Sequence, residues 1–186
     1  MKNERAVMED LRIVAGEGNI RPDKKHPFYK SVWEFTHRDK NGKIIDQWTQ
    51  ENALADEGEQ DILDRTFRGA AAPASFFLRL YNDTPVETDG LADLTGEPSG
   101  NGYAAQALAL NTTDWPTLAL DAGDYQVTSK TVTFTASGGS IGPVTYAVLA
   151  TSSDNTGKLY AYVALSQSRT LADGETLDVS MTIKLQ

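Results

Sequence analysis

The sequence predicts a mainly β protein built as an antiparallel β-sandwich, with one α-helix and an extended N-terminal arm. The clearest pattern is at the C-terminus, where Leu177, Val179, Met181, Ile183 and Leu185 alternate with polar residues. A period of two places these five apolar side chains on one face of a β-strand. A strand with one apolar face needs neighbouring strands and a second layer, which predicts two packed sheets.

Three segments before this strand supply its expected neighbours. Residues 131–136 and 159–166 alternate in the same way, and residues 144–150 are apolar enough to predict a strand covered on both faces. Gly-rich and Asp-Asn turns at residues 138–140 and 154–157 separate these strands. Short strands joined by such turns favour a jelly-roll or immunoglobulin-like sandwich.

The middle of the chain predicts a hairpin, the single helix and a long loop. Residues 31–50 form a hairpin around Asn41-Gly42, because both residues tolerate positive φ angles. Residues 75–81 and 103–110 are expected strands. The intervening loop, residues 82–102, is rich in Gly and Pro, and a loop of this length is functional or packs in an assembly.

The helix is predicted over residues 53–68. Asn52 is expected to cap its N-terminus, and Gly69 to end it in the left-handed conformation. Gly58 in the middle of the helix indicates the close approach of another backbone, which we expect to belong to the sheet.

We expect two regions, an extended arm over residues 1–30 and a sandwich domain with one helix over residues 31–186. The arm is polar apart from short apolar clusters. It is either a loosely tethered tail or a segment that orders against a partner. The candidate partner-binding residues are its apolar side chains: Leu11, Ile13, Val14, Phe28 and Tyr29.

The composition excludes several classes of partner. The net charge of −9 and the lack of a Lys/Arg cluster argue against nucleic acid and anionic membranes. The absence of cysteine excludes disulfides and thiolate metal sites. The N-terminus lacks the apolar core of a signal peptide, and no run is apolar enough to span a bilayer, which predicts assembly in a cytoplasm.

The residue pattern predicts no catalytic, cofactor-binding or metal site, and we expect a protein that is not an enzyme. His26 and His37 stand apart, match no metal spacing, and are expected at the surface. Asp121 and Asp124 flank a turn, but their spacing does not establish the opposed carboxylates of a glycan hydrolase. The Asp154 turn could hold Ca²⁺ loosely, although an ordinary turn explains it.

Several motifs resemble a family of small virion proteins of tailed bacteriophages. The resemblance covers residues 31–186 and is carried by motifs such as Asn52-Ala-Leu-Ala-Asp-Glu-Gly-Glu59, Phe76-Phe-Leu-Arg-Leu80, Gly100-Asn-Gly-Tyr-Ala104, Trp115-Pro116 and Ser129-Lys-Thr-Val-Thr-Phe134. It implies a β-rich structural component of the virion, on the capsid or the tail.

The function expected from this resemblance is capsid decoration, in which a cement protein on the outer surface of the head stabilises contacts between capsid subunits. The expected partners are the major capsid protein or other virion proteins, together with further copies of the chain, with a trimer as the candidate state. One alternative is a tail-associated or head-fibre protein that contacts the host surface or carbohydrate. A second is a virion-borne glycan hydrolase. A carbohydrate-binding module using Trp33, Trp48 or Trp115 as a sugar platform is a further alternative.

Overall fold

The computed structural model of the chain describes residues 29–52 and 54–185. Its regular elements are, in chain order, β1 (Tyr29–Arg38), β2 (Ile44–Asn52), α2 (Asp56–Phe67), β3 (Ser75–Tyr81), the short 3-10 helix η1 (Leu91–Asp93), β4 (Gln106–Ala109), β5 (Thr117–Asp121), β6 (Asp124–Thr128), β7 (Val132–Thr135), β8 (Ile141–Ala150), β9 (Leu159–Leu171) and β10 (Thr176–Leu185).

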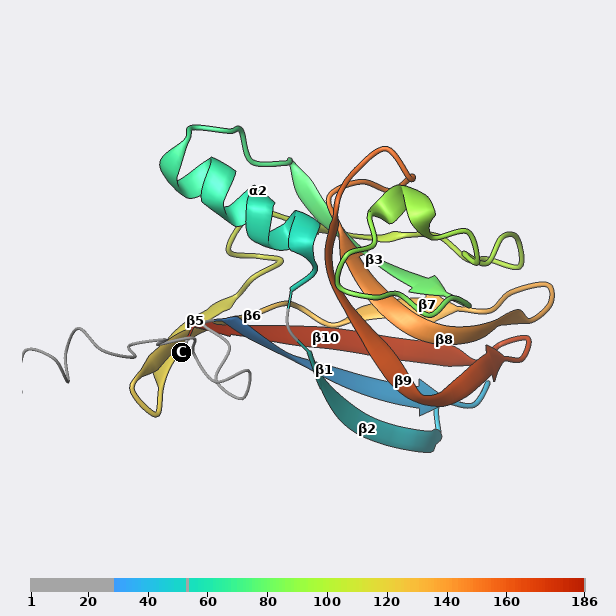
Figure 1. The fold of residues 1–186 in the computed structure, drawn as a ribbon. Coiled ribbons are helices and arrows are strands. Elements are labelled where there is room, and N and C mark those ends of the chain that lie inside the picture. The colour runs from blue at the N-terminus through green and yellow to red at the C-terminus, as the bar shows by residue number, and fades with distance from the viewer. Residues whose placement is uncertain (1–28, 53, 186) are drawn as a thin grey trace, which may run out of the picture.

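These strands form two antiparallel sheets that pack on one another (Figure 1). The first sheet has the order β2-β1-β10-β6-β5, with β7 also paired to β10, and the second has the order β4-β3-β8-β9. The β-sandwich prediction is confirmed. The chain crosses between the sheets several times, so that β10, the last strand, lies at the centre of the first sheet.

The core between the sheets follows the alternation read from the sequence. Leu177, Val179 and Met181 of β10 are buried, and Trp33 and Phe35 of the neighbouring β1 complete the layer. The predicted double cover of β8 is also confirmed, because its residues divide between the main core and a smaller cluster on the outer face of the second sheet.

The N-terminal hairpin is confirmed, but the predicted start of the helix is wrong. The helix begins at Asp56 after the cap residue Ala55, whereas Asn52 ends β2 and donates a side-chain hydrogen bond to the carbonyl of Tyr162. Leu54, expected on the helix, pairs with Ala161 as an isolated β-bridge instead. Burial of Leu54 against the second sheet therefore outweighs the local capping preference of Asn52.

The two glycine predictions for the helix are confirmed. A Cβ added at Gly58 would lie 2.2 Å from the backbone carbonyl oxygen of Tyr160, so the helix packs directly on β9. Gly69 has a φ of 78° directly after the C-cap Arg68, as expected of a left-handed helix stop.

Strands β5 and β6 form a hairpin that the sequence analysis did not assign. The hairpin turns at Ala122-Gly123, both with positive φ, and extends the first sheet through the pairing of β6 with β10. In Figure 1 it projects from one end of the sandwich, beside the C-terminal end of β10. No helix in the described part of the chain has the length and apolarity needed to cross a membrane.

Candidate docking surface

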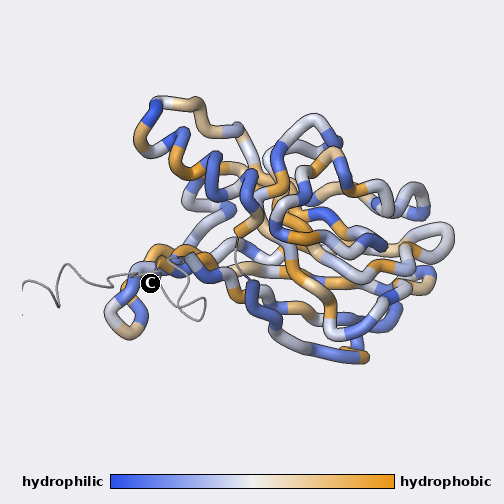
Figure 2. Tube along the Cα trace, viewed as in Figure 1, coloured by the Kyte–Doolittle hydropathy of each residue, from blue (hydrophilic) through white to orange (hydrophobic). Residues whose placement is uncertain are grey.

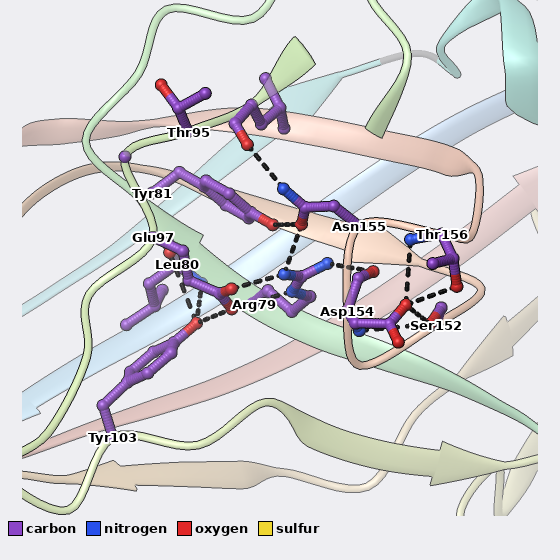
Figure 3. Close-up of polar contacts among 12 residues, drawn as sticks. Arg79, Leu80, Tyr81, Thr95, Glu97, Tyr103, Ser152, Asp154, Asn155 and Thr156 are labelled. Carbon is purple, nitrogen blue, oxygen red and sulfur yellow. Dashed lines mark hydrogen bonds and ion pairs between the residues drawn. The ribbon is translucent and has the colours of Figure 1, made fainter. Parts of the chain in front are cut away.

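Arg79 is the most deeply buried charge on the outer face of the second sheet. Its side chain is 1% exposed, and it donates to Glu97 through Nε at 2.8 Å and also through Nη2 (Figure 3). Further bonds go to the carbonyl oxygen of Asp154 at 2.9 Å and to Oδ1 of Asn155 at 2.8 Å. One guanidinium therefore joins β3 to the long loop and to the turn between β8 and β9.

Glu97 also binds Tyr103, which closes the network. The Tyr103 hydroxyl donates to Glu97 Oε1 at 2.7 Å and accepts from the backbone N–H of Leu80 at 3.0 Å. Burial lowers the pKa of Arg79, but the hydrogen bonds and charge of Glu97 and the nearby tyrosines raise it overall. Burial raises the pKa of Tyr103 well above its usual value. The pair is thus held as a charged arginine and a neutral tyrosine.

The Asp154 turn is explained by its internal hydrogen bonds. Asp154 Oδ1 accepts from the hydroxyls of Ser152 and Thr156, both at 2.6 Å. These bonds hold the pKa of Asp154 down at about 2. Across residues 29–52 and 54–185 no group of three or more acidic or histidine side chains is placed to hold a metal ion.

Glu57 near the start of the helix and the two aspartates of the β5–β6 hairpin also bind groups of the chain itself. Glu57 accepts from the backbone N–H groups of Leu91 at 3.0 Å and Leu159 at 2.5 Å. Asp121 and Asp124 both lie near Lys184 Nζ, at 3.1 and 3.7 Å, on the exposed hairpin. The two aspartates share one cation at the surface and do not face each other across a groove.

The surface position expected for His37 is wrong, and His26 lies outside the described residues. His37 is 6% exposed, and its Nε2 lies 3.1 Å from Glu175 Oε2. The alternation of β1, in which Trp33, Phe35 and His37 share the inward face, places it there.

An apolar groove lies where the helix side of the sandwich meets the β5–β6 hairpin. It is open, has a volume of about 390 Å³, and is lined by Phe76, Leu110, Asn111, Thr112, Trp115, Leu118, Val127, Tyr160 and Ile183. The Nε1 group of Trp115 is buried and has no hydrogen-bond partner within the described residues. A segment that offered apolar side chains would complement the apolar lining of this groove.

The hairpin continues the floor of the groove as an exposed apolar face. Leu118 pairs with Val127, and Val127 pairs with Ile183 of β10, so these three side chains share the face that β10 buries in the core. Leu120 and Tyr125 form the next row and are 62% and 61% exposed. Figure 2 shows the apolar residues running out of the sandwich into the hairpin.

Of the three tryptophans, only Trp115 faces this groove. Trp33 is fully buried. Trp48 stacks on Phe35 with ring centroids 5.0 Å apart, and its ring is also contacted by the guanidinium of Arg169 at 4.2 Å. A sugar platform on Trp33 or Trp48 would require these side chains to move, which leaves Trp115 as the candidate.

The predicted arm residues fall largely outside the described structure. Leu11, Ile13, Val14 and Phe28 all precede residue 29. Tyr29 is the first residue of β1, pairs with Leu185 and is buried in the main core. Its hydroxyl has no partner within the described residues, and burial raises its pKa, with a smaller contribution from Tyr160. The structure therefore gives Tyr29 a core position beside a groove residue.

Comparison with known protein families identifies the family of the chain. Residues 53–184 match the model of the family described as podophage GP4 fiber I protein gp80. The chain belongs to this family. It is therefore a structural component of a tailed-phage virion and associates with other virion proteins, as the resemblance predicted. No curated protein matches the chain.

The match runs from residue 53 to Lys184, so it includes the helix, the second sheet, the residues that line the groove and the β5, β6, β7 and β10 strands of the first sheet, whereas β1 and β2 precede it. The sequence analysis missed the groove because it assigned no strands between residues 117 and 128. The signal was present in short form, with Leu118 and Leu120 before the Ala122-Gly123 turn and Tyr125 and Val127 after it.

Proposed function

We propose that the chain is a non-enzymatic fibre component of the phage particle, in which the sandwich is the body and the N-terminal segment is the attachment arm. The observation that carries this proposal is the match of residues 53–184 to a fiber-protein family. The family's description favours a fibre over the capsid-cementing role that the sequence analysis expected. A position on the fibre also fits a body whose outward feature is a docking groove rather than a polar cleft.

The disposition of the acids supports a non-enzymatic role. A glycan hydrolase needs two carboxyl groups on opposite sides of a substrate cleft. Asp121 and Asp124 share Lys184 at the surface, and Glu97 is engaged by Arg79 and Tyr103. Among the described residues, the groove is lined by apolar side chains with Asn111 and Thr112, and none of these lining residues is an acid.

The division into arm and body is part of the proposal, with its boundary set at the start of β1. Because Tyr29 and Lys30 belong to β1, a test deletion should remove residues 1–28 and keep them. We expect the shortened chain to keep the β-rich circular dichroism spectrum of the full chain and to lose attachment to particles that lack the protein. Loss of the folded spectrum would contradict the division.

The copy number per particle tests the position on the virion. A fibre component should be present in a small number that matches the number of fibres, measured by quantitative mass spectrometry of purified particles. A cement protein should be present in a number tied to the capsid subunits, and its removal should lower the resistance of the particles to heat or chelators. The second pattern would contradict the fibre assignment and indicate a head decoration protein.

A further inference from the structure

The β5 strand forms an edge of the first sheet, and its only charged residue, Asp121, lies beside the turn. The sheet order ends at β5 within the described residues, and Thr117–Asp121 contains no Lys, Pro or bulge. Unprotected apolar edge strands are sites at which another strand pairs. The edge is also continuous with the exposed face of Leu118 and Leu120, which are 73% and 62% exposed.

The hairpin geometry fixes which backbone groups of β5 point outward. The two-residue turn closes on the Asp121–Asp124 pair, so Thr117, Ala119 and Asp121 turn their backbone groups toward β6. Leu118 and Leu120 then turn their N–H and C=O groups away from the sheet. These two residues combine a free backbone edge with exposed apolar side chains.

We propose that this edge pairs with β5 of a second copy of the chain, antiparallel and centred on Ala119. A twofold axis at Ala119 places Leu118 opposite Leu120 of the other copy, and Leu120 opposite its Leu118. The outward backbone groups of both residues are then hydrogen-bonded. Because directly paired residues share a face, the two apolar hairpin faces become one continuous surface.

The pairing brings the two exposed leucines of β5 into contact. Leu118 and Leu120 are 73% and 62% exposed, and in this register each Leu118 side chain lies directly beside Leu120 of the other copy. The pairing also avoids charge conflict, since Asp121 falls opposite Thr117 and each Asp121 keeps its own Lys184.

This pairing concerns how two copies meet and stands apart from the position of the protein on the particle, so the copy number per particle does not test it. The chain contains no cysteine, which makes a single introduced cysteine an unambiguous probe. At the twofold axis the two Ala119 Cα atoms form a non-hydrogen-bonded pair about 4.5 Å apart, within the range that a disulfide accepts. Ala107, exposed on the edge strand β4 of the second sheet, is the matched control.

The experiment is sedimentation and oxidative cross-linking of the full chain and its variants. We expect a dimer, a disulfide-linked dimer as the main product of Ala119→Cys under mild oxidation, and little linkage for Ala107→Cys. Leu118→Glu should raise the dimer dissociation constant about 10-fold, because the twofold axis makes it replace both apolar Leu118–Leu120 cross-strand contacts at once. Ile45→Glu, at a 50% exposed position on the opposite edge strand β2, should leave the dimer intact.

Several results would overturn the proposal. A full chain that stays monomeric, with equal weak linkage of both cysteine variants, would exclude the pairing. Equal loss of association with Ile45→Glu and Leu118→Glu would indicate head-to-tail pairing of β5 with β2. A monomer that dimerises only after deletion of residues 1–28 would identify the chain's own arm as the cover of the face. If circular dichroism shows that Leu118→Glu does not fold, the comparison of Ala119→Cys with Ala107→Cys tests the pairing by itself.

Discussion

The outer face of the second sheet and the face of the β5–β6 hairpin are both apolar surfaces outside the main core. They differ in whether another part of the described chain covers them. The long loop after β3 covers the first, where Leu91 and Leu94 pack with Tyr81 and Val148 in a second small core. The hairpin face has no such cover within residues 29–52 and 54–185, and Leu118 is 73% exposed there.

The difference lies in how polar groups are treated at the two places. Beneath the loop, Arg79 and Asn155 are hydrogen-bonded to the segments that cover them, so closure leaves few groups to satisfy. At the groove, Trp115 Nε1 is buried without a partner in the described chain, next to exposed leucines. The face under the loop is closed by its own chain with its polar groups hydrogen-bonded, whereas the hairpin face is left open by the described residues.

The largest expected effect comes from removing the charge partner of Arg79. Glu97→Ala leaves a fully buried guanidinium without its carboxylate, and we expect a loss of about 3–5 kcal/mol in the free energy of unfolding. Arg79→Leu should cost less, because the Glu97 side chain is 24% exposed and can be hydrated. Urea unfolding followed by circular dichroism measures both.

The matched control is the surface pair of Lys30 and Glu51, whose side chains are 28% and 60% exposed. Glu51→Ala should change the free energy of unfolding by no more than about 1 kcal/mol. An equal loss for Glu97→Ala and Glu51→Ala would show that the buried network does not hold the loop.

The second prediction concerns alkaline pH and Tyr160, which lies in the wall of the groove. Burial raises its pKa from 10.0 to about 12, with a smaller contribution from Asp61. The neutral phenol is therefore favoured in the folded state, so its stabilisation is complete below pH 10 and is lost as the pH rises toward 12. We expect Tyr160 alone to remove on the order of 2–3 kcal/mol from the free energy of unfolding over this window.

Unfolding curves at several pH values check this. Tyr160→Phe should make the decline above pH 10 shallower without abolishing it, because burial also raises the pKa of Tyr29 and Tyr103. Identical profiles for the wild-type chain and Tyr160→Phe would contradict the assignment.

A smaller effect is expected where the helix meets β9. Gly58→Ala normally stabilises a helix by about 1 kcal/mol, but here the new Cβ meets the carbonyl oxygen of Tyr160 at 2.2 Å. Overpacking against backbone costs about 1–3 kcal/mol, so we expect a net loss of roughly 1–2 kcal/mol. The exposed Gln60→Ala in the same helix is the control and should change the free energy of unfolding by less than about 0.5 kcal/mol.

The sequence predicted the sandwich because its signals are local. The alternation along β10 predicts a strand, and Asn41-Gly42 predicts a turn. The lack of a side chain at Gly58 predicts the close approach of another backbone. The N-terminal cap of the helix was predicted wrongly because Leu54 pairs with Ala161 of β9, and this tertiary contact decides where the helix begins.

The groove could not be predicted for a related reason. Its walls come from Phe76, Trp115 and Tyr160, which are far apart in the sequence, and its floor depends on β6 pairing with β10. The buried Arg79 network likewise joins three segments separated by up to 76 residues. Periodicity reports which face of a strand is apolar, but it carries no information on which segment covers that face.

The smallest effect on folding is expected at the hairpin, and it separates the stability of the fold from association. Leu120→Ser removes apolar surface that is already 62% exposed, so the free energy of unfolding of the dissociated chain should change by less than about 0.5 kcal/mol. The same change should weaken association, because it removes a side chain from the centre of the proposed pair. Measuring unfolding at several protein concentrations distinguishes the two, since only association makes the midpoint depend on concentration. A loss of about 2 kcal/mol at every concentration would mean that Leu120 is part of the fold's own core, and the contrast between the closed face and the open face would then fail.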